Sequence, residues 1–182
     1  MAAPEPAVQF RSLFEFFGDA APDLPGFEVL PPDQVPQPYR DLLVHEHHMT
    51  VTLERFHGRP VEVRILRQVR TGNQYARMIL LALEGGDEIV QFGIVRIDLS
   101  CCDEAVQAEI LAGKTPLGRI LIAHNVLRHI DPTAFLKITP DRAMMQWFEI
   151  EKVQPVYGRL ATIYCNGLPA IELLEVVRPE KS

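Results

Sequence analysis

Apolar and polar residues alternate through the middle of the chain, and this pattern predicts three consecutive strands. The strands are expected over residues 61–66, 75–83 and 89–99. Successive side chains of a strand point to opposite faces, so such alternation suits a sheet with a buried face. The segments between these strands are short and rich in Gly, Asn and Asp, which requires neighbouring strands to be antiparallel.

A second set of strands is expected towards the end of the chain. Residues 159–164 and 170–177 flank the sequence Cys165-Asn166-Gly167-Leu168. Asn-Gly accepts the positive φ angles that a tight hairpin turn demands. Residues 135–138 add one further strand. The chain is therefore expected to form a single antiparallel sheet of about six strands.

Helical periodicity falls between groups of strands rather than after each strand. Helices are expected over residues 39–56, 102–111 and 116–122, while residues 144–152 fit either helix or strand. An interruption of the first helix is expected near Met49, because Thr50 and Thr52 lower helix propensity. This order of elements predicts an α+β fold with inserted helices, and no glycine-rich phosphate loop is present.

The first 38 residues differ from the rest in composition, because residues 1–40 hold most of the prolines. They predict a Pro-rich, largely irregular arm, with one short helix over residues 10–17. Residues 39–182 then form the single folded domain, and the chain length suits one core with room for a small ligand pocket.

The 182 residues carry a formal net charge of −6 and no block of basic residues. Nucleic acid and membrane are therefore not expected as partners. An anionic ligand would need Arg or Lys placed locally inside the fold. No signal peptide or membrane span is recognisable, and three cysteines do not resemble a disulfide framework, so a cytoplasmic location is expected. The sequence does not fix the oligomeric state.

Three charged residues within strands are candidates for binding or catalysis. Arg77 shares a strand face with Ile79 and Leu81, and a buried Arg needs a partner such as a bound carboxylate. The alternative is an Arg on the outer face of an edge strand. Glu172 and Glu175 are three residues apart, so a regular strand directs them to opposite faces, and an inward Glu would have a raised pKa. The alternative is that both are solvated, which is the preferred interpretation for a Glu in an arbitrary strand.

His45-Glu46-His47-His48 has the composition of a metal site but lacks a second cluster at a recognisable ligand spacing. Solvated or capping histidines are the preferred interpretation, and no metal is expected. The adjacent Cys101 and Cys102 lack a positioned histidine, so they are interpreted as small apolar residues rather than nucleophiles.

Four motifs, in matching order, resemble the bacterial chorismate lyase family over roughly residues 40–180. The most specific is Gly113-Lys114-Thr115-Pro116-Leu117-Gly118-Arg119. The others are His48-Met49-Thr50, the strand Tyr75-Ala76-Arg77-Met78-Ile79-Leu80-Leu81, and the last hairpin, which ends in Glu175-Val176-Val177-Arg178-Pro179.

The resemblance implies an antiparallel sheet with helical flaps that enclose a ligand. It assigns Arg77 to a ligand carboxylate and Glu175 to catalysis, with Glu172 as the alternative catalytic residue. Met49, Leu117 and Gly93 match positions around the pocket. Where the family has an Arg after this glycine, the chain has Ile94, with Arg96 two positions on.

The implied function is a chorismate pyruvate-lyase, a carbon–oxygen lyase that converts chorismate to pyruvate and a hydroxybenzoate, most simply 4-hydroxybenzoate. No cofactor is expected, because forming the aromatic ring drives the reaction. The alternative is a non-catalytic domain of the same fold that binds a small aromatic acid, as in effector domains of bacterial transcription regulators. Such a domain is normally fused to a basic helix-turn-helix, a pattern that residues 1–40 do not show. A third possibility is an enzyme acting on another small aromatic or enol acid.

Overall fold

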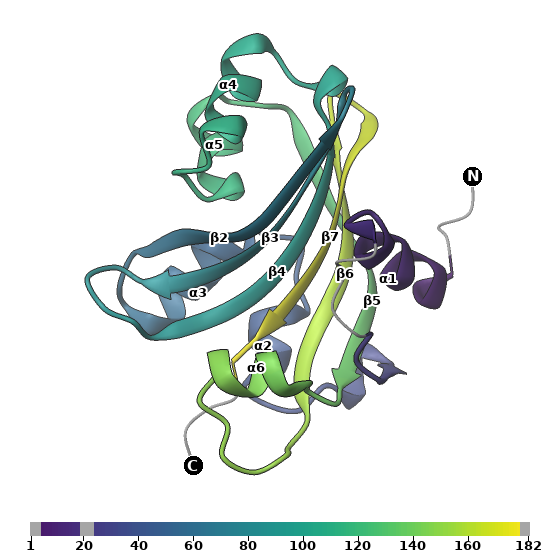
Figure 1. Cartoon of the computed structure of the whole chain (residues 1–182), viewed down its shortest axis with the longest axis vertical. Helices are drawn as coiled ribbons and strands as arrows, with labels where there is room; N and C mark the ends of the chain where they lie inside the picture. The colour runs from purple at the N-terminus through teal and green to yellow at the C-terminus, as the bar shows by residue number, and fades with distance from the viewer. Residues whose placement is uncertain (1–4, 19–23, 179–182) are drawn as a thin grey trace.

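The architecture is a single curved antiparallel sheet with helices on both faces (Figure 1). The computed structural model describes residues 5–18 and 24–178, so Pro179 of the terminal motif lies outside the described residues. The strands run in the order β1-β5-β6-β7-β4-β3-β2. Their bounds are β1 Phe27–Leu30, β2 Val61–Thr71, β3 Gln74–Leu83, β4 Ile89–Asp98, β5 Arg128–Ile138, β6 Val156–Cys165 and β7 Leu168–Val177.

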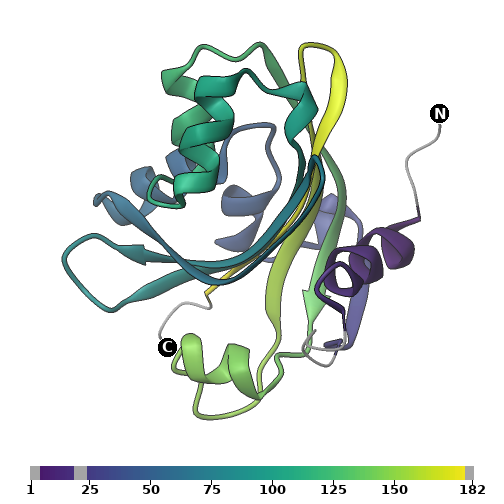
Figure 2. The ribbon, with the colours of Figure 1, turned by 45° about the horizontal axis from the view of Figure 1, so that its top comes forward.

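Six α-helices are described beside the sheet. They are α1 Pro6–Glu15, α2 Tyr39–Leu43, α3 Met49–His57, α4 Glu104–Ala112, α5 Leu117–Ala123 and α6 Arg142–Trp147, with 3-10 turns η2 Pro32–Gln34 and η3 Leu99–Cys101. Figure 2 shows α1 on one side of the sheet and α4 and α5 on the other. None of the described helices is long and apolar enough to cross a membrane.

The expected α+β fold with one antiparallel sheet is confirmed, and each of the six expected strands is present. A seventh strand, β1, pairs with β5 in antiparallel register. Its four residues alternate too briefly to be recognised from periodicity, and its place is fixed by pairing with a distant strand. The expected interruption near Met49 is also confirmed, since residues 44–48 separate α2 from α3.

Alternation along the strands divides the core into two layers. Met78 and Leu80 of β3 face α1 and α6, where Phe10 and Phe14 of α1 are buried. Burial of each large apolar side chain stabilises the fold by about 1.5–3 kcal/mol, which attaches α1 to the sheet. The opposite side chains of β3 face α2, α3, α4 and α5.

The last hairpin forms where it was expected. Asn166 and Gly167 connect β6 to β7 with φ angles of 53° and 83°. Both angles lie in the left-handed region, which the Asn-Gly pair tolerates. The turn sets the register that places Arg159 of β6 opposite Glu175 of β7.

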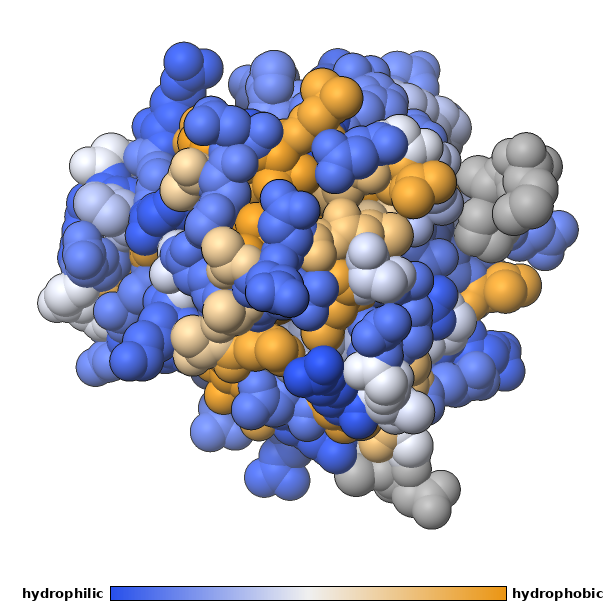
Figure 3. Space-filling view, turned by 90° about the horizontal axis from the view of Figure 1, so that it is seen from above, coloured by the Kyte–Doolittle hydropathy of each residue, from blue (hydrophilic) through white to orange (hydrophobic). Residues whose placement is uncertain are grey.

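The end of the molecule that carries α4 and α5 is mostly polar, with a band of apolar side chains across it (Figure 3). Large apolar side chains are scattered over the described surface, with Leu127 the most exposed at 73%.

Candidate functional site

A pocket with about 510 Å³ of empty space, part of it open to solvent, lies on the sheet face covered by α3 and α5. Most of its wall is apolar, with a few polar side chains among them. The lining residues are His48, Met49, Thr50, Arg77, Ile79, Leu81, Gln91, Gly93, Ile94, Val95, Pro116, Leu117, Gly118, Ile163, Leu173, Leu174 and Glu175.

Arg77 is the most unusual residue of the pocket, because its side chain is fully buried and no contact of its nitrogens has the geometry of a hydrogen bond. Its exposure is 0%, and none of its three side-chain nitrogens makes a hydrogen bond with any residue in the described ranges. Burial lowers the pKa of the guanidinium, and the neighbouring Tyr75 offsets this only in part. The Tyr75 hydroxyl donates its own hydrogen to Gln68, 3.0 Å away. A buried guanidinium without a partner is costly, so a bound anion is the natural way to satisfy it.

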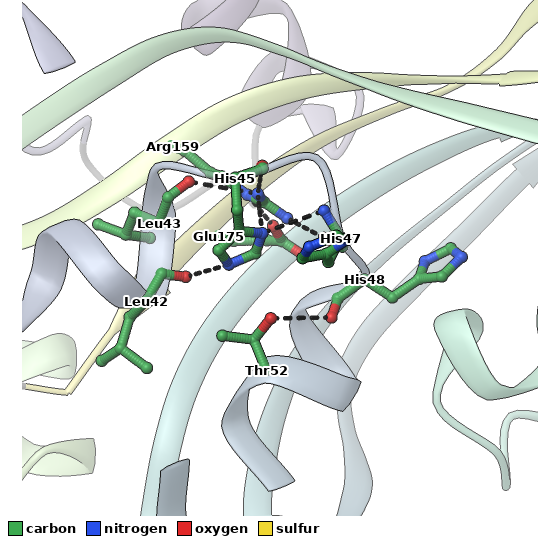
Figure 4. A network of polar contacts seen from close by, with 8 residues as sticks. All are labelled: Leu42, Leu43, His45, His47, His48, Thr52, Arg159 and Glu175. Atoms are coloured by element: carbon green, nitrogen blue, oxygen red, sulfur yellow. Dashed lines mark hydrogen bonds and ion pairs between the residues drawn. The ribbon is translucent and has the colours of Figure 1, made fainter. Parts of the chain in front are cut away.

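Glu175 is held by a second buried Arg. The Nε of Arg159 donates to a Glu175 carboxylate oxygen at 2.7 Å, and the Arg159 side chain is only 1% exposed. The same guanidinium donates to the carbonyl oxygens of Leu43, His45 and His47. Figure 4 shows these contacts converging on Arg159 from the segment between α2 and α3. The pair is therefore electrically neutral and anchors that segment to the sheet.

The N-terminal end of α3 closes one side of the pocket. His48 precedes this helix, and its ring points away from Arg159 (Figure 4). The His48 ring accepts a hydrogen bond from Arg128 Nε. His48 also packs against Gly118, so closely that a Cβ added at Gly118 would lie 3.0 Å from the Cβ of His48. Burial and then Arg128 lower the pKa of His48 to about 4, so the ring is neutral at pH 7. An ion pair between Glu54 and Arg119 ties α3 to α5.

The structure brings most of the predicted site residues together. Arg77, Met49, Leu117, Gly93 and Glu175 all line the pocket. Their roles in ligand binding or catalysis stay predictions, since a position in the wall does not identify a role.

Glu172 lies apart from these residues, on the sheet face opposite the pocket. It pairs directly with Arg96 of β4 and forms an ion pair with it. The two glutamates thus point to opposite faces, as their spacing requires. Ile94 borders the pocket.

Sequence reasoning missed three polar residues of the site: Gln91, Arg159 and His48. Arg159 has the same signal that drew attention to Arg77, a cation among apolar strand residues. Gln91 gave a weaker signal, because a neutral amide in a strand is common on surfaces. His48 was interpreted as solvated or capping, but it is 8% exposed and makes no side-chain cap.

The histidine and cysteine clusters were considered for metal binding and for nucleophilic chemistry. Within the ranges the structure describes, no group of three His, Cys, Asp or Glu side chains could hold a metal ion. Burial raises the pKa of Cys102 to about 11, which keeps it a thiol and a poor nucleophile at pH 7.

No protein-family model matches the chain, and no curated protein matches its sequence. Its fold does match solved structures. PhnF from Mycobacterium smegmatis aligns with 11% identity and a TM-score of 0.50 over 75% of this chain and 65% of PhnF. The effector domain of PhnF gives 10% identity and a TM-score of 0.50 over 72% of this chain and 88% of that domain. A GntR-family transcriptional regulator from Bacillus cereus aligns with 13% identity and a TM-score of 0.46, over 67% of this chain and 94% of that one.

At these identities the two PhnF comparisons show a shared fold and no more. The chain spans just under two thirds of PhnF but most of its effector domain. The fold is thus an α+β fold shared with the effector domain of PhnF and consistent with the chorismate lyase-like fold.

The predicted function, a chorismate lyase, is wrong by these findings, because the structures matched at a TM-score of 0.50 are PhnF and its effector domain rather than a lyase. The pocket agrees with this correction. The carboxylate of Glu175, the predicted catalytic group, forms an ion pair with Arg159. Among the described lining residues, Arg77 is the single uncompensated cation, whereas chorismate carries two carboxylates.

The exclusion of nucleic acid is corrected as well. It rested on the net charge of −6. The fold is shared with the effector domain of PhnF, which is one part of a longer protein, so the charge of such a unit does not exclude nucleic-acid binding by another domain. The net charge of a single domain therefore does not decide whether the whole protein binds nucleic acid.

Proposed function

We propose that the chain is a non-catalytic domain that binds one small aromatic carboxylic acid in the pocket between the sheet, α3 and α5. The observation that carries the proposal is Arg77, a fully buried cation with no partner among the described residues. A carboxylate can accept two parallel hydrogen bonds from a guanidinium, and burial strengthens them.

The rest of the wall suits such a ligand. Ile79, Leu117 and Leu173 offer apolar surface to a flat ring. The first backbone N–H groups of α3, at Met49 and Thr50, lie at the positive end of a nine-residue helix that borders the pocket. Arg77 and this helix end together favour a single negative charge, while the Arg159–Glu175 pair contributes none.

The effector domain of PhnF supports a regulatory role for ligand occupancy, which we extend to this chain as a proposal. A DNA-binding partner domain would then receive the signal. A cytoplasmic location is part of the same proposal and agrees with the three free cysteines in the described chain.

The test combines turnover with binding. Purified protein at high concentration is incubated with chorismate, and pyruvate release is followed; its thermal unfolding is then measured with and without hydroxybenzoates. We expect no pyruvate above the uncatalysed rate and a rise of several degrees in Tm with saturating ligand, because binding stabilises the folded state by mass action. Enzyme-dependent pyruvate release, or no Tm change with any small aromatic acid, would contradict the proposal.

A further inference from the structure

A second unsatisfied polar group lies in the same pocket. Gln91 is only 3% exposed, and its Oε1 has no hydrogen-bond partner among the described residues. A buried amide oxygen without a donor is costly and uncommon in folded proteins. Like Arg77, Gln91 therefore has a buried polar group without a partner. Arg77 lacks an acceptor, whereas the Oε1 of Gln91 lacks a donor.

The register of the sheet places the two groups apart. Arg77 lies opposite Val95, and Gln91 lies on the same face of β4, four residues from Val95. Four residues of a strand span about 13 Å. Gly93 lies midway between Val95 and Gln91, so β4 itself contributes no side chain at this point.

Gly93 also explains how the amide of Gln91 reaches into the pocket. A Cβ on Gly93 would lie 3.3 Å from Gln91 Nε2 and 3.3 Å from Ile79 Cγ1. The amide thus folds back along β4, over the glycine and towards the end that holds Arg77. A larger residue at position 93 would displace it.

A second acceptor borders this point. Glu175 pairs with Gly93 across the sheet, and one of its carboxylate oxygens is used by Arg159. Around Gly93 the pocket therefore has the donor Gln91 Nε2 as well as the acceptors Gln91 Oε1 and Glu175, whereas Arg77 supplies donors only.

We propose that Gln91 determines ligand specificity by accepting a hydrogen bond from a hydroxyl or amino group of the ligand, at the end away from its carboxylate. This inference rests on the proposed function and deepens it. The ligand class is narrowed to aromatic acids that carry a donor substituent. An acid without this substituent leaves Oε1 unsatisfied, and sites built around a hydrogen bond reject such analogues strongly.

The test is a calorimetric titration with matched acids. The 3- and 4-hydroxybenzoate isomers are compared with benzoate and with the corresponding methoxybenzoates, which accept but do not donate. The native chain is expected to bind its better hydroxybenzoate about tenfold more tightly than either analogue. In Gln91→Leu, this preference over benzoate should fall to about twofold or less, with benzoate affinity kept or improved.

Gln154→Leu is the matched control, because Gln154 is exposed and lies outside the pocket. It should keep the native preference. Gln91→Leu should also keep or raise Tm, which shows that it folds. An unchanged preference in Gln91→Leu, or a native chain that binds the methoxy acid as well as the hydroxy acid, would overturn the role of Gln91 but leave the acid-binding function standing. A native chain that binds none of these acids would overturn both proposals.

Discussion

Two arginines, both almost completely buried, have opposite relations to the fold. Arg159 satisfies Glu175 and three backbone carbonyl groups, whereas Arg77 satisfies no described group. A buried charge stabilises a fold only when its partners repay the loss of hydration. Arg159 is therefore a structural residue. Arg77 is expected to destabilise the ligand-free fold, as a residue would whose partner is a bound ligand.

This contrast predicts opposite effects of one substitution at the two positions. Without ligand, Arg77→Met should raise the free energy of unfolding by about 1–4 kcal/mol, because an unpaired buried charge is replaced by an apolar chain. Arg159→Met should lower it by about 3–5 kcal/mol, because Glu175, whose side chain is only 12% exposed, loses its partner. Urea unfolding at pH 7.5 measures both. Destabilisation by Arg77→Met would mean that the guanidinium has a structural role.

His48 makes stability depend on pH. Its pKa is lowered to about 4 in the folded chain, from 6.5 in the unfolded chain, first by burial and then by Arg128. The unfolded chain therefore takes up a proton first as the pH falls. The contribution of His48 is fully present above pH 6.5 and is lost between about pH 6.5 and 4.

Urea unfolding at pH 7 and pH 5 should show a loss of about 2 kcal/mol that is attributable to His48. His48→Gln keeps an acceptor for Arg128 but does not titrate, so its loss over the same range should be smaller by that amount. His45, whose pKa is also lowered to about 4, remains in both proteins and cancels in the comparison. Equal losses in the two proteins would show that His48 is not held neutral.

The sequence predicted parts of the site and left others open for physical reasons. Strand periodicity placed Glu172 and Glu175 on opposite faces, but which face is covered depends on where distant helices pack. The pairing of Arg159 with Glu175 depends on the register of β6 and β7. The amide of Gln91 packs over Gly93, which has no side chain to displace it. The alternation of apolar and polar residues does not reveal this packing.

At the scale of elements, the contact between β6 and β7 depends on a glycine. A Cβ on Gly158 would lie 2.6 Å from the carbonyl oxygen of Glu175, which belongs to the backbone and cannot turn away. The same pair of strands carries the Arg159–Glu175 ion pair. The close approach of β6 and β7 at Gly158 therefore also holds Arg159 beside Glu175, which keeps this ion pair formed.

Gly158→Ala should lower the free energy of unfolding by about 1–3 kcal/mol, as expected for an overpacked contact. Gly26→Ala is the control, because no atom lies within 4 Å of the added Cβ and the φ angle of Gly26 is not positive. Its effect should stay within about 0.5 kcal/mol. Thermal or urea unfolding of both variants decides the matter, and similar effects would mean that β6 can shift to accept a side chain.

Elements differed in how well the sequence predicted them. The hairpin at Asn166-Gly167 and the break between α2 and α3 are set by local chemistry, and both form as expected. Strand β1 is set by pairing with β5, more than a hundred residues away in the sequence, so local alternation did not predict it. Residues 142–147 form α6, where an Asp141 side chain accepts from the N–H of Met144 and resolves the ambiguity between helix and strand.

At the scale of the whole molecule, the sheet separates a packed layer from a layer that holds a pocket. The face under α1 and α6 is a closed apolar core. On the other face, the apolar clusters under α4 and α5 and under α2 and α3 leave the pocket between them. A ligand there would contact β3, β4, β7 and the starts of α3 and α5, and so would join elements that are otherwise linked mainly through the sheet.

The central claim is that this pocket binds one acid group through Arg77. Isothermal titration calorimetry of 4-hydroxybenzoate against the native chain and Arg77→Met, in the same buffer at pH 7.5, tests it most directly. The account predicts one site per native chain and an affinity at least about a hundredfold weaker in Arg77→Met, as expected when a buried charged hydrogen bond is lost. Equal affinity in the two proteins would contradict it.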